Sequence, residues 1–264
     1  MPTPPKKHVI DLLVVAAEHP RTDYVLLRLT NPDGPLPTML PGQFVEVLVE
    51  NSTDTFLRRP ISINRVCRES NELWLLIHAI GSGTRTLSEL RAGNWLNCLL
   101  PLGNGFSIPE GKGKRLLLVG GGVGTAPLLH YGEELLRAGH EPTFLLGGRT
   151  ANDVLQMELF EQVGRVFVTT EDGSAGERGY VTQHSLLTRE SFDGIATCGP
   201  KPMMMAVAAY ANKCNTPCEA SLENMMACGL GACLCCVEKN NEGHNVCVCK
   251  EGPVFNTEKL SWQN

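Results

Sequence analysis

Six of the chain's eleven cysteines lie in one short segment, ENMMACGLGACLCCVEKNNEGHNVCVCKEGPVF, residues 223–255. Cys228, Cys233 and Cys236 have the spacing C-x4-C-x2-C, and further cysteines follow downstream. This is the plant-type arrangement that binds a [2Fe-2S] cluster. The glycines of CGLGAC allow backbone N–H groups to turn inward and donate hydrogen bonds to the sulfur atoms. The segment therefore predicts an iron–sulfur site.

The metal and the fourth ligand of this site have alternatives. Four thiolates also suit tetrahedral Zn²⁺, but zinc sites of this kind favour paired C-x2-C units, and only one such pair is present. Cys235 lies outside the C-x2-C register, and we interpret it as a neighbour that does not bind the metal. Cys247 and Cys249 are both available as the last ligand.

A glycine-rich turn, VGGGVGTAP, lies between the apolar run RLLLV and the helical pattern APLLHYGEELLRAG. The bare N–H groups and helix dipole of a strand–turn–helix unit can bind a dinucleotide pyrophosphate. The third glycine of the G-x-G-x-x-G pattern is missing, so a tight turn without a ligand is the alternative. The candidate nucleotide-binding residues are Gly120, Gly121, Gly122, Gly124 and Thr125.

Basic and hydroxyl side chains further upstream could also bind phosphate. Arg59 and Ser62 lie in FLRRPISIN, and the later motif GSGT contains Gly83 and Thr84. A guanidinium can bind phosphate oxygens bidentately, and a backbone N–H and a hydroxyl can donate to the same group. For each fragment taken alone, an ordinary solvated surface is the alternative.

Two kinds of secondary structure must position these residues. Short β-rich runs such as QFVEVLVE and LWLLIHAI, separated by turn-forming segments, predict a small antiparallel β-barrel in the first hundred residues. From Lys114 strands and helices alternate, which predicts a doubly wound parallel α/β sheet. We place the barrel at residues 1–110, the α/β domain at 111–215 and a small iron–sulfur domain at 216–264.

Composition limits the partners and the compartment. The chain has 264 residues, a formal net charge of -5 and no long run of like charges, which argues against a nucleic-acid-binding surface. No apolar run reaches about 18 residues, so a membrane span is not expected. Asp11 and Glu18 interrupt the apolar stretch near the N-terminus, so no signal peptide is expected either. Clustered cysteines without export predict reduced thiols in the cytoplasm.

The order of the motifs PGQF, RRPIS, GSGT, PLGNGF, GGGVGTAP, GGR and CGPKPMM resembles the ferredoxin-reductase family of flavoproteins. The resemblance implies an FAD-binding barrel followed by a pyridine-nucleotide domain, with Cys198 and Gly199 near the nicotinamide. The FAD contacts that it implies are Arg59, Pro60, Ile61, Ser62, Leu76, Ile77, His78, Gly83 and Thr84. His78 stands near where the family often has an aromatic residue, and an ordinary strand histidine is an equal interpretation. For Cys198, the alternative is a buried structural cysteine.

The order CGLGACLCCVE…VCKEGPVF further resembles the electron-transfer subunits of NAD-dependent dihydroorotate dehydrogenases. That resemblance selects Cys249 as the fourth cluster ligand, with Cys228, Cys233 and Cys236. It implies an FMN-containing partner subunit that converts dihydroorotate to orotate in pyrimidine biosynthesis, in a heterotetramer with two copies of each chain. It also favours NAD, although Arg149 stands where the 2′-phosphate of NADP could bind and no acidic residue ends that strand.

The three cofactors together predict an electron path. NADH gives up a hydride, the cluster takes one electron at a time and flavin can do both, so FAD must lie between the other two. The sequence contains no nucleophile elbow, and its histidines do not have the spacing of metal ligands. No separate catalytic site is therefore predicted. The rival functions are an NAD(P)H reductase subunit linked to ferredoxin or hydrogenase, and a zinc-stabilised nucleotide-binding regulator.

Overall fold

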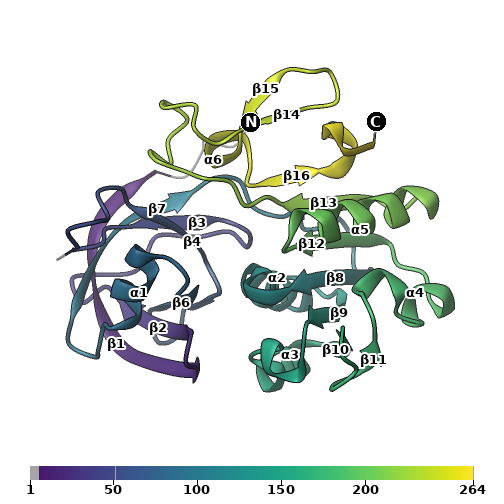
Figure 1. The fold of residues 1–264 in the computed structure, drawn as a ribbon, viewed down its shortest axis with the longest axis horizontal. Helices are drawn as coiled ribbons and strands as arrows, with labels where there is room; N and C mark the ends of the chain where they lie inside the picture. Colours follow the sequence, from purple (N-terminus) through teal and green to yellow (C-terminus); the bar gives the residue numbers. More distant parts are fainter. Residues whose placement is uncertain (1–5, 51, 264) are drawn as a thin grey trace.

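A computed structural model describes residues 6–50 and 52–263, which form two large β-sheets and a C-terminal segment that lies against both (Figure 1). In Figure 1 the N-terminal sheet is on the left, the α/β sheet is on the right, and the C-terminal segment runs along the top. No helix in these described ranges is long and apolar enough to cross a membrane.

The N-terminal sheet is antiparallel and curls on itself, which confirms the predicted barrel as a half-barrel. Its strands are β1 (His8–Arg21), β2 (Tyr24–Thr30), β3 (Phe44–Val47), β4 (Arg59–Ser62), β5 (Arg65–Cys67), β6 (Glu72–His78) and β7 (Trp95–Leu102), in the order β4-β3-β7-β1-β2-β6-β5. Irregular pairing between β1 and β2 increases the local twist and bends the long strand β1. Alternating leucine and valine side chains such as Leu27, Leu29 and Leu75 fill the interior, and α1 (Ser82–Ser88) packs Leu87 against them.

The second sheet contains the parallel strands that the sequence predicts. They are β8 (Arg115–Gly121), β9 (Glu141–Gly148), β10 (Arg165–Thr170), β11 (Glu177–Arg178), β12 (Gly194–Cys198) and β13 (Cys218–Ser221), with β16 (Val254–Asn256) antiparallel at one edge. The order is β11-β10-β9-β8-β12-β13-β16. The chain therefore reverses its direction of winding between β8 and β12, and in such sheets ligands bind beyond the strand ends at this point.

Helices cover both faces of the parallel sheet because its strands are buried on both sides. Leu116 and Leu118 pack towards α2 (Ala126–Arg137) and α3 (Met157–Val163), whereas Leu117 and Val119 pack towards α4 (Leu186–Arg189) and α5 (Lys201–Lys213). This confirms the doubly wound arrangement. Short 3₁₀ turns complete the connections: η1 (Gly122–Thr125), η2 (Ala151–Asp153), η3 (Val181–Gln183), η4 (Thr257–Lys259) and η5 (Ser261–Gln263).

The C-terminal segment leaves the α/β sheet and returns to it. Ser221 in β13 pairs with Val254 in β16, and between them lie β14 (Val237–Lys239), β15 (Asn245–Cys247) and α6 (Val248–Glu251). The segment packs Val248 against Phe44 and Leu102 of the barrel. The domain boundaries at 110 and 215 stay predictions, and strand pairing joins residues 218–221 to the α/β sheet.

Candidate functional site

A cavity of about 270 Å³ lies between the barrel and the α/β domain. Seven of the residues predicted to contact FAD line it, and they come from β4, from β6 and from α1. These seven are Pro60, Ile61, Ser62, Leu76, Ile77, His78 and Thr84. The opposite wall is formed by Val123 and by residues of the segment that follows β13, including Glu223 and Met226. Residues far apart in the sequence therefore meet around one space.

The two other predicted FAD contacts, Arg59 and Gly83, lie next to each other. A Cβ atom on Gly83 would lie 3.0 Å from Arg59 Nε and 2.9 Å from Thr55 Cγ2, so only glycine allows this close approach. Within residues 6–50 and 52–263, the hydrogen bonds that Arg59 donates are long, to the carbonyl oxygens of Leu57 (3.4 Å) and Arg58 (3.3 Å). Arg58 instead binds the carbonyls of Glu46 and Asn97 inside the barrel. Arg58 therefore has a structural role, whereas Arg59 is suited to bind an anion.

A larger cavity, of about 680 Å³, opens beyond the carboxyl ends of β8, β9 and β12. The predicted residues Gly121, Gly122, Gly124 and Gly199 line it. A Cβ atom on Gly124 would lie 2.5 Å from Gly199 Cα and 2.6 Å from Gly199 N, so the two glycine turns touch through their backbones. The cavity lies at the point where the sheet changes its winding direction, which is where sheets of this kind bind phosphate groups.

Two predicted nucleotide-site residues lie behind the wall of this cavity. Thr125 is buried, and its hydroxyl donates to the carbonyl of Gly122 at 3.0 Å, which closes the turn. Cys198 is buried at the end of β12, and burial raises the pKa of its thiol well above the usual value. Both residues support the turns that carry the lining glycines.

The two cavities share a wall formed by His78, Val123 and Glu223. The His78 ring stacks on Tyr24, with ring centroids 4.3 Å apart and an interplanar angle of 8°. His78 Nε2 lies 3.1 Å from Asp23 Oδ2. Burial raises the pKa of Glu223. The histidine is therefore a stacked residue between the cavities, whereas the sequence left its role open and did not indicate Tyr24 or Glu223.

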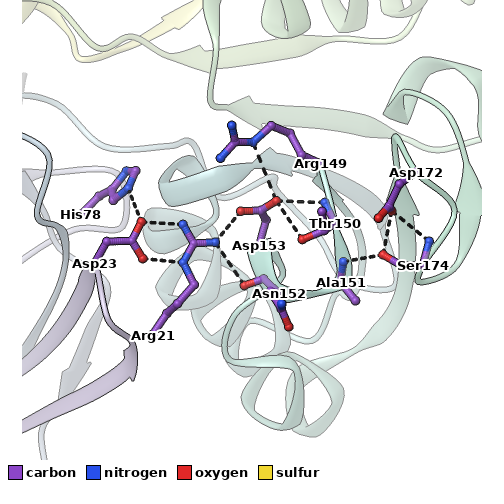
Figure 2. A network of polar contacts seen from close by, with 10 residues as sticks. All are labelled: Arg21, Asp23, His78, Arg149, Thr150, Ala151, Asn152, Asp153, Asp172 and Ser174. Carbon is purple, nitrogen blue, oxygen red and sulfur yellow. Dashed lines mark hydrogen bonds and ion pairs between the residues drawn. The ribbon is translucent and has the colours of Figure 1, made fainter.

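A polar network runs from the barrel to the rim of the larger cavity (Figure 2). Arg21 binds the carboxylate of Asp23 and reaches Asp153 Oδ1 of the α/β domain at 2.5 Å. Burial opposes ionisation of Asp153, but hydrogen bonds from Arg21 and the Thr150 N–H hold its pKa below the usual value. Nothing in the local sequence predicts this contact, because its partners lie 132 positions apart.

The cysteine loop is shaped by residues with positive φ, namely Gly229 (64°), Gly231 (78°) and Leu234 (58°). Backbone N–H groups point at three of the predicted ligands. Leu230 N lies 3.4 Å from Cys228 Sγ, Gly231 N lies 3.1 Å from Cys249 Sγ, and Cys249 N lies 3.3 Å from Cys236 Sγ. Burial opposes ionisation of Cys228, but N–H groups of Leu230, Cys233 and Ala232 lower its pKa to about 6. Such N–H···S contacts suit thiolates that bind a [2Fe-2S] cluster.

The remaining cysteines of this loop differ in position. Cys233, the fourth predicted ligand, is exposed, as is Cys235. Cys247 is buried, and its N–H donates to Glu251 Oε1 at 2.8 Å. Across residues 6–50 and 52–263, no three His, Cys, Asp or Glu side chains converge in a metal-binding geometry. The choice of Cys228, Cys233, Cys236 and Cys249 stays a prediction.

Known protein families match this chain in the cysteine-rich segment and in the α/β domain. A family model described as the iron-sulfur cluster binding domain of dihydroorotate dehydrogenase B matches residues 223–261, and an oxidoreductase NAD-binding domain matches residues 118–209. A Shouchella clausii protein named dihydroorotate dehydrogenase B (NAD(+)), electron transfer subunit, is 40% identical over 219 residues, covering 81% of this chain and 84% of the relative. A Geobacillus protein of the same name is 41% identical over the same length, with the same shares covered.

Solved structures share the fold. An NADH-dependent reduced ferredoxin-NADP oxidoreductase has a TM-score of 0.85 and 28% identity, covering 96% of this chain and 90% of its own. The flavohemoglobin of Malassezia yamatoensis has a TM-score of 0.66 and 17% identity, covering 79% of this chain and 57% of its own. The second likeness shows the fold alone.

Proposed function

Since the chain belongs to the family of electron-transfer subunits of dihydroorotate dehydrogenase B, we propose that it carries electrons between NAD(H) and an FMN-containing catalytic subunit. It is an oxidoreductase subunit whose cofactors are FAD, a [2Fe-2S] cluster and NAD. The catalytic subunit would interconvert dihydroorotate and orotate in pyrimidine biosynthesis. The assembly would be a heterotetramer with two copies of each chain.

The observation that carries this proposal is the wall shared by the two cavities. A flavin in the smaller cavity and a nicotinamide in the larger one would meet at His78, Val123 and Glu223. Bound FAD would supply the conversion between two-electron and one-electron chemistry. The chain's part is to orient the two rings and to keep water away. Stacked His78 and Tyr24 form a flat boundary suited to this task.

The cysteine loop continues directly from the flavin cavity. Met226 lines that cavity, and Cys228 follows two residues later. Cys228, Cys233, Cys236 and Cys249 would hold the cluster. The exposed side of the loop at Cys233 would then face the catalytic subunit, so the electrons would leave the chain there.

Purified subunits test the proposal. The chain alone should reduce an artificial dye with NADH and should not act on dihydroorotate or orotate. Addition of the FMN-containing subunit should create NAD-dependent dihydroorotate oxidation. Dihydroorotate oxidation by this chain alone would contradict the proposal.

A second candidate partner is ferredoxin, because the solved structure with 28% identity is a reduced ferredoxin-NADP oxidoreductase. The same assay separates the two partners. Reduction of ferredoxin, with no coupling to the FMN-containing subunit, would favour this alternative.

A further inference from the structure

We propose that Asp153 makes the larger cavity selective for NAD over NADP, by neutralising Arg149 and by fixing a negative charge where the 2′-phosphate of NADP would bind. The inference rests on the proposed function only in requiring that a pyridine nucleotide occupies this cavity. It assigns a specificity-determining role to a residue of the network in Figure 2.

The topology places the adenosine ribose next to Arg149. In a doubly wound sheet the pyrophosphate lies at the glycine turn after the first strand, and the ribose lies over the carboxyl end of the neighbouring strand. Here these are the turn after β8 and the end of β9 at Gly148. Arg149 follows immediately, and Asp153 lies one short turn later. Both side chains line the larger cavity.

Arg149 by itself would favour NADP, because an arginine at this position can bind a 2′-phosphate. Its side chain is 76% exposed, and Arg149 Nε lies 3.9 Å from Asp153 Oδ2. The Asp153 carboxylate is therefore close enough to offset the arginine's charge. It would also repel a phosphate that approached the same side chain.

Asp153 is fixed in place, which distinguishes it from an ordinary surface carboxylate. Its side chain is only 11% exposed, and Oδ2 accepts hydrogen bonds from Thr150 N at 2.9 Å and Thr150 Oγ1 at 3.3 Å. Arg21 of the barrel holds Oδ1 at 2.5 Å. The carboxylate therefore has little freedom to turn away from an incoming phosphate.

A second acidic residue strengthens the same preference. Glu171 follows β10 and lines the cavity, and its backbone N–H donates to the carbonyl of Gly148 at 3.1 Å. Two carboxylates, those of Asp153 and Glu171, thus border the rim on which Arg149 lies. Arg21 also lines the cavity, but Asp23 binds its guanidinium and neutralises its charge, so Asp153 remains available to offset Arg149. The strand itself ends in glycine, so the acidic group that commonly marks an NAD site at a strand end is supplied here from the next turn.

The test compares ligands that differ only in the 2′-phosphate. Calorimetry would measure the affinities of ADP and 2′,5′-ADP for wild-type protein, Asp153→Asn and the double variant Asp153→Asn/Arg149→Ala. Steady-state dye reduction would give kcat and KM for NADH and NADPH. Asn keeps the size of the side chain and an oxygen that accepts from Thr150, so the turn is retained, whereas its NH2 group cannot accept from Arg21 and that contact is lost.

In Asp153→Asn, the affinity for 2′,5′-ADP relative to ADP should rise about tenfold or more. The KM for NADPH should fall in step, so that kcat/KM for NADPH rises relative to kcat/KM for NADH. The gain should vanish in the double variant. Asp172→Asn is the matched control, because Asp172 belongs to the same network and binds Ser174 but does not line the cavity.

An unchanged ligand ratio in Asp153→Asn, or an equal gain in Asp172→Asn, would overturn the inference. Arg149→Ala in the wild-type background tests it independently of the Asp153 turn. Because Asp153 already offsets this arginine, the relative affinity for 2′,5′-ADP should change by less than about threefold, and a tenfold loss would contradict the inference. Failure of the wild-type protein to bind ADP and NAD would instead refute the nucleotide site itself.

Discussion

The two cavities and the cysteine loop are built in different ways. The cavities are lined mainly by residues at the ends of strands and helices that belong to two large sheets with well-packed cores, and Glu223 and Met226 complete the smaller one. Within the described residues, the cysteine loop contains the small hairpin of β14 and β15 and the one-turn helix α6, and it leaves large apolar side chains such as Met225 (82%) and Leu234 (61%) exposed. Both cavities are therefore formed largely by the two packed sheets.

We expect the cysteine loop, in contrast, to gain part of its order from its metal. Three of its thiol sulfur atoms accept hydrogen bonds from backbone N–H groups. Metal binding to such a site contributes directly to folding. Loss of the metal should therefore affect the loop more than the cavities.

The largest effect is expected from removal of a cluster ligand. Cys236→Ser should abolish cluster binding and accelerate hydrogen exchange in residues 228–249, because a thiolate ligand is lost. FAD content and NADH-dependent dye reduction should be largely retained. Iron analysis, the EPR spectrum of the reduced cluster and hydrogen-exchange mass spectrometry would measure these changes.

Cys235→Ser is the matched control and should keep the cluster. Cys249→Ser should lose the cluster and Cys247→Ser should keep it, because Gly231 N–H points at the sulfur of Cys249. Retention of iron in Cys236→Ser would show that the ligand set is wrong.

The stability of the protein should depend on pH through Glu46, a residue of β3 in the barrel that lies next to the cysteine loop. Glu46 is fully buried, and in the described chain neither of its carboxylate oxygens has a hydrogen-bond partner. A Cβ atom on Gly229 would lie 2.8 Å from Glu46 Cγ. Burial raises the pKa of Glu46 to about 7, although Arg58 opposes the shift. The folded state therefore binds a proton that the unfolded state releases at lower pH.

The free energy of unfolding should consequently fall as the pH rises from about 4.5 to about 7. Glu46→Gln should be more stable than wild type above pH 7, by up to about 3 kcal/mol, and similar to it near pH 4. Urea unfolding at several pH values would measure this difference. Equal stability of the two proteins at pH 8 would rule out the raised pKa.

Next to the smaller cavity, Arg59→Ala should weaken FAD binding without loss of the cluster. A charge-assisted contact to phosphate contributes about 1.5–3 kcal/mol, which corresponds to a ten- to hundredfold loss of affinity. Fluorescence titration of the apoprotein with FAD would measure the loss. Arg68→Ala is a suitable control, because Arg68 is exposed and pairs with Glu134. Unchanged FAD affinity in Arg59→Ala would remove this residue from the site.

The smallest effect is expected at the glycine turn of the larger cavity. Gly124→Ala would place a methyl group against the backbone of Gly199, and relief of this clash should shift both turns. The KM for NADH should rise about tenfold. The corresponding loss of binding free energy lies within the range that overpacking usually costs. Gly34→Ala, where no atom lies within 4 Å of the added Cβ, should behave as wild type. A normal KM in Gly124→Ala would show that the nucleotide does not use this turn.

Local motifs predicted much of this arrangement, because their function depends on residues that are close in sequence. Pro60, Ser62, His78 and Gly124 line cavities where the motifs placed them. The strand β16 was not anticipated, because a three-residue edge strand depends on its pairing with β13 more than on its own sequence.

Contacts between the domains could not be predicted in the same way. Arg21 and Tyr24 of the barrel meet Asp153 and the glycine turns only because the barrel packs against the α/β sheet at this edge. Arg21 is an ordinary surface arginine by sequence. Its role becomes visible only when the two sheets are placed together.

The pairing of Ser221 with Val254 has a consequence for how such a chain can change. The two residues are direct neighbours across β13 and β16. Residues 222–253 therefore form an insertion that leaves the sheet and returns to it at adjacent positions. A longer or shorter insertion would leave the register of the sheet unaltered, since loop closure depends only weakly on length. Descendants of one nucleotide-binding scaffold could therefore acquire, exchange or discard a metal module at this position. A chain without this segment would need other residues to replace Glu223 and Met226, which form one wall of the smaller cavity.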